Sequence, residues 1–196
     1  CNQVLFYNGG NSGVQEGQAT LTGYMLFKRF NRSVSLTNPG VASQFRPSII
    51  FRLADFYLMY AEAANEVNPN DVRVLKYLNL VRERAGLPGV ETLNPAIRGN
   101  QELQRAAIQR ERQVELATEG QRYFDVRRWM IADKNGEGRQ NGYAHGMNVR
   151  GEPNDIDDFN RVVEASQIVF NRKMYLYPMP DSEMRKTKNL VQNPGW

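Results

Sequence analysis

Apolar residues recur every three or four positions between about residues 51 and 86, a pattern typical of helices that bury one face. The expected buried stripe of the first helix is Leu53, Tyr57, Tyr60, Ala64 and Val67. This stripe is widened by Ala54, Leu58 and Ala61. The expected stripe of the second helix is Val74, Leu78, Val81 and Ala85. The pattern predicts a helix pair over 51–86 whose first helix packs on more than one neighbour.

The turn inside this pair is marked by a proline and by capping residues. The residue before a proline avoids helical backbone, so the first helix should end near Asn68, which precedes Pro69. Either Asn70 or Asp71 can cap the second helix. The unit is about as long as one tetratricopeptide repeat of roughly 34 residues, and such repeats need neighbours to bury their apolar faces. We therefore expect further repeats outside this chain, together with a contact from a later helix.

The remaining segments differ in composition. Residues 1–50 are rich in turn formers and are expected to be irregular. A long helix is predicted over 101–131, with Gly120 as a point where it can bend. Its expected apolar stripe is Leu103, Ala107, Val114 and Ala117. Gly, Asn and Asp dominate 133–160, which predicts a loop excursion, and short strands are expected within 167–177. The fold class is therefore mainly α, with irregular loops and a few short strands.

The residues that usually carry chemistry are scarce. Among the 196 residues, Cys1 is the only cysteine and His145 the only histidine. This excludes a Cys/His structural zinc site and leaves little basis for an imidazole-activated nucleophile. His145 lies in a Gly-rich stretch and is expected to be an exposed loop residue. No Gly-rich phosphate-binding loop is present, so we expect neither a cofactor nor a metal.

The net charge of +4 does not indicate a nucleic-acid partner. Basic residues are interleaved with acidic ones through most of the chain, whereas nucleic-acid-binding proteins usually concentrate them on one face. The densest basic cluster, 185–188, is short and contains no aromatic residue. Binding of nucleic acid is therefore not expected.

Three glutamates on the predicted long helix stand four positions apart, at 111, 115 and 119. Carboxylates at this spacing could hold a metal or act in acid–base catalysis. However, arginines surround them, and Arg112–Glu115 and Glu119–Arg122 are i,i+3 neighbours that can form ion pairs. We therefore predict a structural ion-pair network and no catalytic residue. Its predicted members are Glu111, Arg112, Glu115, Glu119, Arg122, Asp125 and Arg128.

Aromatic and amide side chains lie together in the irregular first segment. Aromatic rings that stack on sugar faces, beside amides that bond hydroxyl groups, form carbohydrate-binding surfaces. The candidate ligand-binding residues are Tyr7, Asn8, Asn11 and Tyr24. The alternative is that these aromatics only cover the helical core, and no spacing rule separates the two interpretations.

Several segments together resemble the SusD/RagB family, the nutrient-binding lipoproteins of Bacteroidetes outer membranes. Residues 51–63, FRLADFYLMYAEA, are similar to a helix motif of that family, and NLVRERAG follows at 79–86. Residues 111–129, ERQVELATEGQRYFDVRRW, are similar to a second motif. The third similarity pairs YLYPMP at 175–180 with QNPGW at 192–196. In this order and combination the motifs are highly specific.

The resemblance implies a tetratricopeptide-like α–α superhelix of four helix pairs, of which 51–86 is the last. It also implies a surface-exposed subunit of the outer membrane that performs no catalysis. Such a subunit captures oligosaccharides, or peptides in some members, and delivers them to a TonB-dependent transporter of the SusC type. The repeats meet the transporter and variable loops contact the ligand, so the motif residues are expected to be scaffold.

The family motifs belong to the C-terminal portion of longer proteins. We therefore expect 51–196 to be a C-terminal region and 1–50 to continue from a missing N-terminal part. Cys1 is then a fragment start rather than the lipidated cysteine, and the lipid anchor lies outside this chain. Two other functions are also compatible with the sequence. One is a tetratricopeptide-type protein-interaction scaffold, and the other is a metal-dependent hydrolase that uses the three glutamates.

Overall fold

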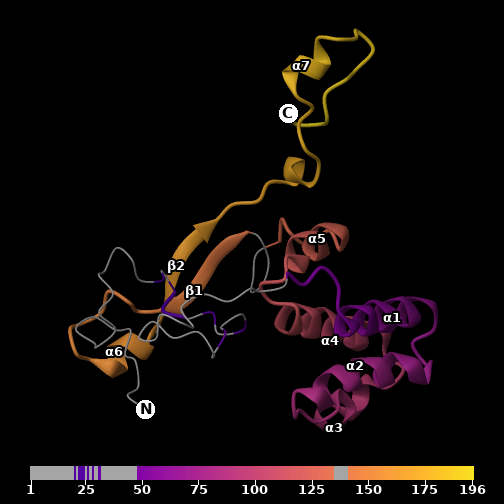
Figure 1. Ribbon diagram of the computed structural model, residues 1–196, viewed down its shortest axis with the longest axis vertical. Helices are drawn as coiled ribbons and strands as arrows, with labels where there is room; N and C mark the ends of the chain where they lie inside the picture. The colour runs from indigo at the N-terminus through magenta and orange to yellow at the C-terminus, as the bar shows by residue number, and fades with distance from the viewer. Residues whose placement is uncertain are drawn as a thin grey trace, which may run out of the picture. The chain divides into compact units, whose positions relative to one another are not determined.

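The computed structural model describes residues 20, 22–24, 26, 28, 31, 48–134 and 141–196. The chain forms two compact units, one over Arg46–Arg128 and the other over Cys1–Phe45 with Trp129–Trp196. Most regular structure in the described residues is helical (Figure 1), which confirms the predicted mainly α fold. No helix in these residues has the length and apolar character needed to cross a membrane.

The helical unit, 46–128, begins with the predicted helix pair. Its elements are α1 (Leu53–Val67), α2 (Val72–Arg84), α3 (Val90–Leu93), a 3-10 turn η3 (Pro95–Ile97), α4 (Gln101–Glu115) and α5 (Gln121–Arg128). The first helix ends directly before Asn68 and Pro69, and Asp71 caps α2 by accepting the backbone N–H of Arg73 at 2.9 Å. A hydrogen bond from the Arg73 side chain lowers the pKa of Asp71 to about 2, so this cap is ionised at neutral pH.

The core of this unit lies where α1 and α2 pack on each other and on α4 (Figure 1). It is formed by Leu58, Ala61, Val74, Leu78, Val81, Val90, Ile97, Ile108 and Leu116. The predicted stripe of α1 is displaced around the helix. Leu53, Tyr60 and Val67 are 62%, 41% and 87% exposed, whereas Leu58 and Ala61 are fully buried. The stripe of α2 is buried at three of its four predicted positions, because Ala85 lies beyond the helix end and is exposed.

The single long helix predicted over 101–131 is wrong. The chain forms α4 and α5, separated by residues 116–120, and α5 ends at Arg128. Thr118 and Gly120 adopt positive φ angles of 67° and 83°, a left-handed backbone that ends a right-handed helix. The predicted stripe of α4 is also misplaced, because Val114 is 63% exposed while Gln104, Ile108, Glu111 and Arg112 face inward.

The second unit contains a two-stranded antiparallel sheet, whose strands lie side by side (Figure 1). Its elements are β1 (Gly142–Met147), α6 (Ile156–Asn160), β2 (Val162–Ile168), a 3-10 turn η4 (Arg172–Tyr175) and α7 (Asp181–Met184). The register pairs Gly142 with Ile168 and Met147 with Val162. The predicted loop over 133–160 thus contains a strand and a helix, and the predicted strands over 167–177 are replaced by the end of β2 and a 3-10 turn.

A close contact at Gly146 explains why the β1 segment differs from the prediction. Gly146 is needed there because a Cβ would lie 2.6 Å from the Cα of Thr22, whose carbonyl accepts the backbone N–H of Met147 at 2.9 Å. Gly146 therefore lies in a strand because the neighbouring backbone comes so close, although the glycines in this segment predict a loop. His145 lies on β1 and not in a loop, although it is exposed as expected.

Candidate functional site

A buried arginine joins three helices of the helical unit. Arg112 of α4 donates from Nη1 to Oδ1 of Asp55 on α1 and from Nε to Oδ2 of Asp125 on α5, both at 2.9 Å. All three side chains are at most 4% exposed. The single guanidinium therefore gives a hydrogen-bonded counter-charge to two buried carboxylates that would otherwise be costly to remove from water.

This cluster continues to the surface through Arg128. Its Nη2 lies 2.9 Å from Oδ1 of Asp125, and its Nη1 lies 2.5 Å from Oε1 of Glu62 on α1. Burial lowers the pKa of the Arg128 guanidinium, but the carboxylates of Glu62 and Asp125 raise it above its ordinary value overall. The Arg128–Glu62 pair thus holds α5 against α1, whereas the Arg128–Asp125 pair lies within α5.

A second cluster lies at the carboxyl end of α4. Arg52, directly before α1, contacts Oε1 of Glu115 at 2.5 Å and Oε2 of Glu119 at 2.7 Å, and it also donates to the Glu115 carbonyl at 2.6 Å. Arg84 of α2 lies 2.6 Å from the same Oε1 of Glu115. The carboxylate of Glu115 therefore links the start of α1 to the end of α2.

The predicted network residues are thus largely brought together, but by partners from other helices. Arg112 bonds Asp55 and Asp125 rather than Glu115, and Glu111 pairs with Arg82 of α2 at 2.8 Å. Arg122 lies half-buried on α5. The partners missed from the sequence are Arg52, Asp55, Glu62, Arg82 and Arg84. Their one sequence signal is that acidic and basic residues interrupt the apolar stripes of α1 and α2.

The acidic groups of the network are ion-paired with arginines. Glu111, Glu115 and Glu119 each have a guanidinium nitrogen within 2.8 Å, so each of these carboxylates forms an ion pair with an arginine of another segment. Within the described ranges, no group of three or more His, Cys, Asp or Glu side chains is arranged to hold a metal ion.

The predicted ligand-binding residues are only partly described. Tyr7, Asn8 and Asn11 lie outside the described residues, as does Cys1. Tyr24 is described and is 56% exposed. It follows Gly23, where φ is +69° and an added Cβ would lie 2.9 Å from the Cβ of Met147. The turn at 22–24 therefore packs closely on the end of β1 and leaves the Tyr24 ring accessible.

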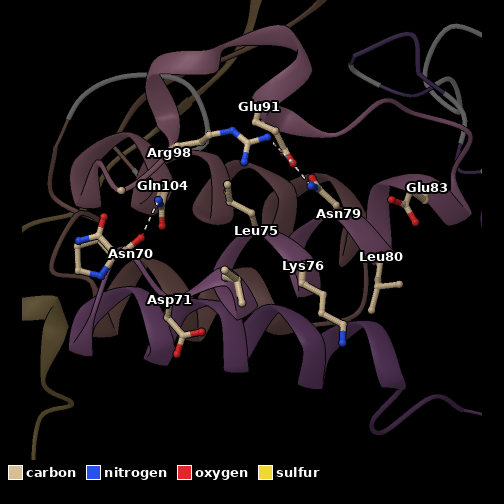
Figure 2. A pocket seen from close by; sticks show the side chains of 13 residues that line it. Asn70, Asp71, Leu75, Lys76, Asn79, Leu80, Glu83, Glu91, Arg98 and Gln104 are labelled. Carbon is tan, nitrogen blue, oxygen red and sulfur yellow. Dashed lines mark hydrogen bonds and ion pairs between the residues drawn. The ribbon is translucent and has the colours of Figure 1, made fainter.

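A pocket of about 450 Å³ opens on the helical unit (Figure 2). It is lined by the α1–α2 turn, one face of α2, the α3 segment and the start of α4. The lining residues are Pro69, Asn70, Asp71, Val72, Leu75, Lys76, Asn79, Leu80, Glu83, Glu91, Arg98, Gly99 and Gln104. Sequence periodicity does not predict this pocket, because its residues come from four separate segments.

Polar contacts shape one wall of this pocket (Figure 2). Asn79 accepts the backbone N–H of Val90 at 3.1 Å and donates to Oε2 of Glu91 at 2.8 Å. Burial raises the pKa of the Glu91 carboxyl, but the hydrogen bond from Asn79 and the nearby Arg98 lower it below its ordinary value overall. Glu91 is therefore ionised at neutral pH and accepts hydrogen bonds inside the pocket.

Comparison with known proteins identifies the family. The sequence profile of the SusD family matches residues 1–196. SusD-like protein P2 of Formosa agariphila is 31% identical over 151 residues, which are 76% of this chain and 26% of that protein. The crystal structure of a SusD-like protein from Bacteroides fragilis NCTC 9343 has 32% identity and a TM-score of 0.60, over 76% of this chain and 26% of that one.

A further solved structure, BT4246, has 34% identity and a TM-score of 0.65 over 78% of this chain and 25% of the other. The chain spans about a quarter of the length of each of these relatives. The family profile covers every residue, and the motifs at 51–63 and 111–129 contain Asp55, Arg112 and Asp125 of the buried ion pairs. This chain belongs to the SusD family.

Proposed function

We propose that this chain is part of a cell-surface nutrient-binding subunit that delivers its ligand to a TonB-dependent, SusC-like transporter of the outer membrane. An oligosaccharide is the favoured ligand and a peptide is the alternative. A lipid anchor holds the subunit at the membrane. Membership of the SusD family supports this proposal, as do the names of the relatives.

The observation that carries the binding role is the buried ion-pair network of the motif helices. A hydrolase needs a carboxylate or imidazole that can reach its substrate. Here Arg112 is 3% exposed and its two carboxylate partners are equally buried, so these groups fix the docking of α1, α4 and α5 instead. The helical unit then acts as a rigid scaffold, and the exposed ring of Tyr24 belongs to the part of the chain proposed to contact ligand.

A protein-interaction scaffold is the second candidate. It is supported by aromatic side chains that stay exposed at the start of α1, where the Phe51 and Phe56 rings lie 6.1 Å apart and are 67% and 53% exposed. Exposed apolar patches of this kind often mark protein-binding surfaces. This surface is compatible with contact between a nutrient-binding subunit and its transporter, so it does not displace the first proposal.

Isothermal titration of the intact protein against a panel of oligosaccharides and peptides tests the proposal. We expect heat of binding with at least one oligosaccharide and recovery of that oligosaccharide uncleaved after incubation. Absence of heat with every ligand would contradict the proposal. Capture of a protein partner by a protein without saccharide or peptide affinity would favour the scaffold function instead.

A further inference from the structure

The pocket between α2 and α3 is built before any ligand arrives. Gln104 is fully buried and donates from Nε2 to the carbonyls of Pro69 and Ile97, both at 3.0 Å. Asn79, 9% exposed, holds α3 through its bonds to Val90 and Glu91. Two buried amides thus fix opposite walls, and a ligand would lose little free energy in ordering them.

Two glycines allow the surrounding loops to lie this close. At Gly99 φ is +68°, and an added Cβ would collide with Oδ1 of Asn70 across the end of the pocket. At Gly89 an added Cβ would lie 3.0 Å from Nδ2 of Asn79. The loop at Gly99 therefore needs glycine for its positive φ, and a side chain at position 89 would press on Asn79.

Charged side chains of both signs line the pocket. They are the carboxylates of Asp71, Glu83 and Glu91 and the cations of Lys76 and Arg98 (Figure 2). Arg98 lies 3.8 Å from Glu91, too far for a close pair, and its side chain is 69% exposed. A ligand with a strong charge of either sign would meet like charges here, whereas hydroxyl groups can donate to the carboxylates and accept from the cations.

Apolar surface accompanies these polar groups. Leu75 and Leu80 line the pocket from α2, and Leu80 remains 37% exposed. Small-molecule sites commonly combine a mainly apolar lining with a few fixed polar groups, in cavities of about 300–1,000 Å³. A sugar ring matches this combination because its C–H groups can lie on the leucines while its hydroxyls bond the rim.

We propose that the pocket lined by Leu75, Asn79, Leu80, Glu83, Glu91 and Arg98 binds a neutral oligosaccharide. This inference rests on the proposed saccharide-binding function and places an additional binding site on the helical unit. Glu91 and Glu83 accept hydroxyl hydrogen bonds, and Arg98 and Lys76 donate to ring or hydroxyl oxygens. Asn79 positions Glu91 rather than acting as a main contact.

The test uses the intact protein with maltohexaose, cellohexaose, xylohexaose and mannohexaose, each carrying a photoactivatable diazirine. After illumination, labelled peptides are identified by mass spectrometry. The variant Glu83→Ala/Arg98→Ala removes two side chains at the exposed rim. The matched control, Glu102→Ala/Arg110→Ala, makes the same change in charge at exposed positions of α4 outside the pocket.

We expect at least one saccharide to label residues 69–104 in the unaltered protein and the control, and at least tenfold less labelling of this segment in the pocket variant. Labelling confined to other segments, or equal labelling of 69–104 in the pocket variant, would overturn the inference and leave the proposed function intact. Absence of labelling anywhere in the unaltered protein would contradict both.

Discussion

Replacing Arg112 with alanine is expected to lower the free energy of unfolding by about 3–5 kcal/mol, because it leaves two buried carboxylates without a counter-charge. The carboxylates are those of Asp55 and Asp125, each 2.9 Å from the guanidinium and 4% exposed. Arg128 still reaches Asp125 from the surface, but Asp55 has no other ion-pair partner among the described residues. Loss of Arg112 should therefore weaken the contact between α1 and α4 most.

Urea unfolding followed by circular dichroism measures this effect. The matched control is Arg110→Ala, two positions away on α4 and exposed, for which a change within about 0.5 kcal/mol is expected. If Arg112→Ala does not fold, a triple variant with Asp55→Asn, Arg112→Met and Asp125→Asn gives a second readout. Removal of all three charges should restore much of the lost stability. Equal stability of Arg112→Ala and the control would contradict the structural role of Arg112.

Replacing Leu58 with alanine is expected to cost about 2–5 kcal/mol, the range for a buried leucine whose removal leaves a cavity. Leu58 is fully buried where α1 packs on α2 and α4. Leu53→Ala makes the same chemical change on the same helix at a side chain that is 62% exposed, and should change stability by less than about 0.5 kcal/mol.

Thermal or urea unfolding of both leucine variants decides which face of α1 is buried. Apolar periodicity makes Leu53 a member of the stripe and Leu58 a residue that only widens it, whereas in the structure Leu58 is fully buried and Leu53 is exposed. A larger loss for Leu53→Ala than for Leu58→Ala would show that the face inferred from periodicity is the buried one.

The helix pair can be predicted from the sequence because its signals are local. Pro69 ends α1, and Asp71 caps α2 by accepting the backbone N–H of Arg73, only two residues further along the chain. The apolar positions Val74, Leu78 and Val81 of α2 face the core as expected.

The buried face of α4 cannot be found in this way, since it is built largely from polar side chains. Gln104, Glu111 and Arg112 are buried, and each bonds a partner on another segment. Asp55 lies 57 positions before Arg112 in the chain, and the i,i+3 rule considers only neighbours on one helix. Apolar periodicity therefore selects Val114, which faces solvent.

The break between α4 and α5 and the position of β1 depend on backbone conformation. Gly120 gave a signal for a bend, but the left-handed Thr118 did not, because threonine rarely adopts that conformation. Gly142 and Gly146 suggest a loop, yet pairing with β2 and the close approach of Thr22 make their segment a strand. Tertiary contacts decide both cases.

We expect the acidic residues of α4 to hold helices together and not to act on a ligand. Glu115 tests this expectation most directly, because its carboxylate is 12% exposed and bonds both Arg52 and Arg84. For Glu115→Gln, urea unfolding and saccharide titration of the same sample should show a loss of about 1–2 kcal/mol in stability and unchanged saccharide affinity. Unchanged stability, together with lost affinity or with loss of a saccharide-cleaving activity of the unaltered protein, would contradict this expectation.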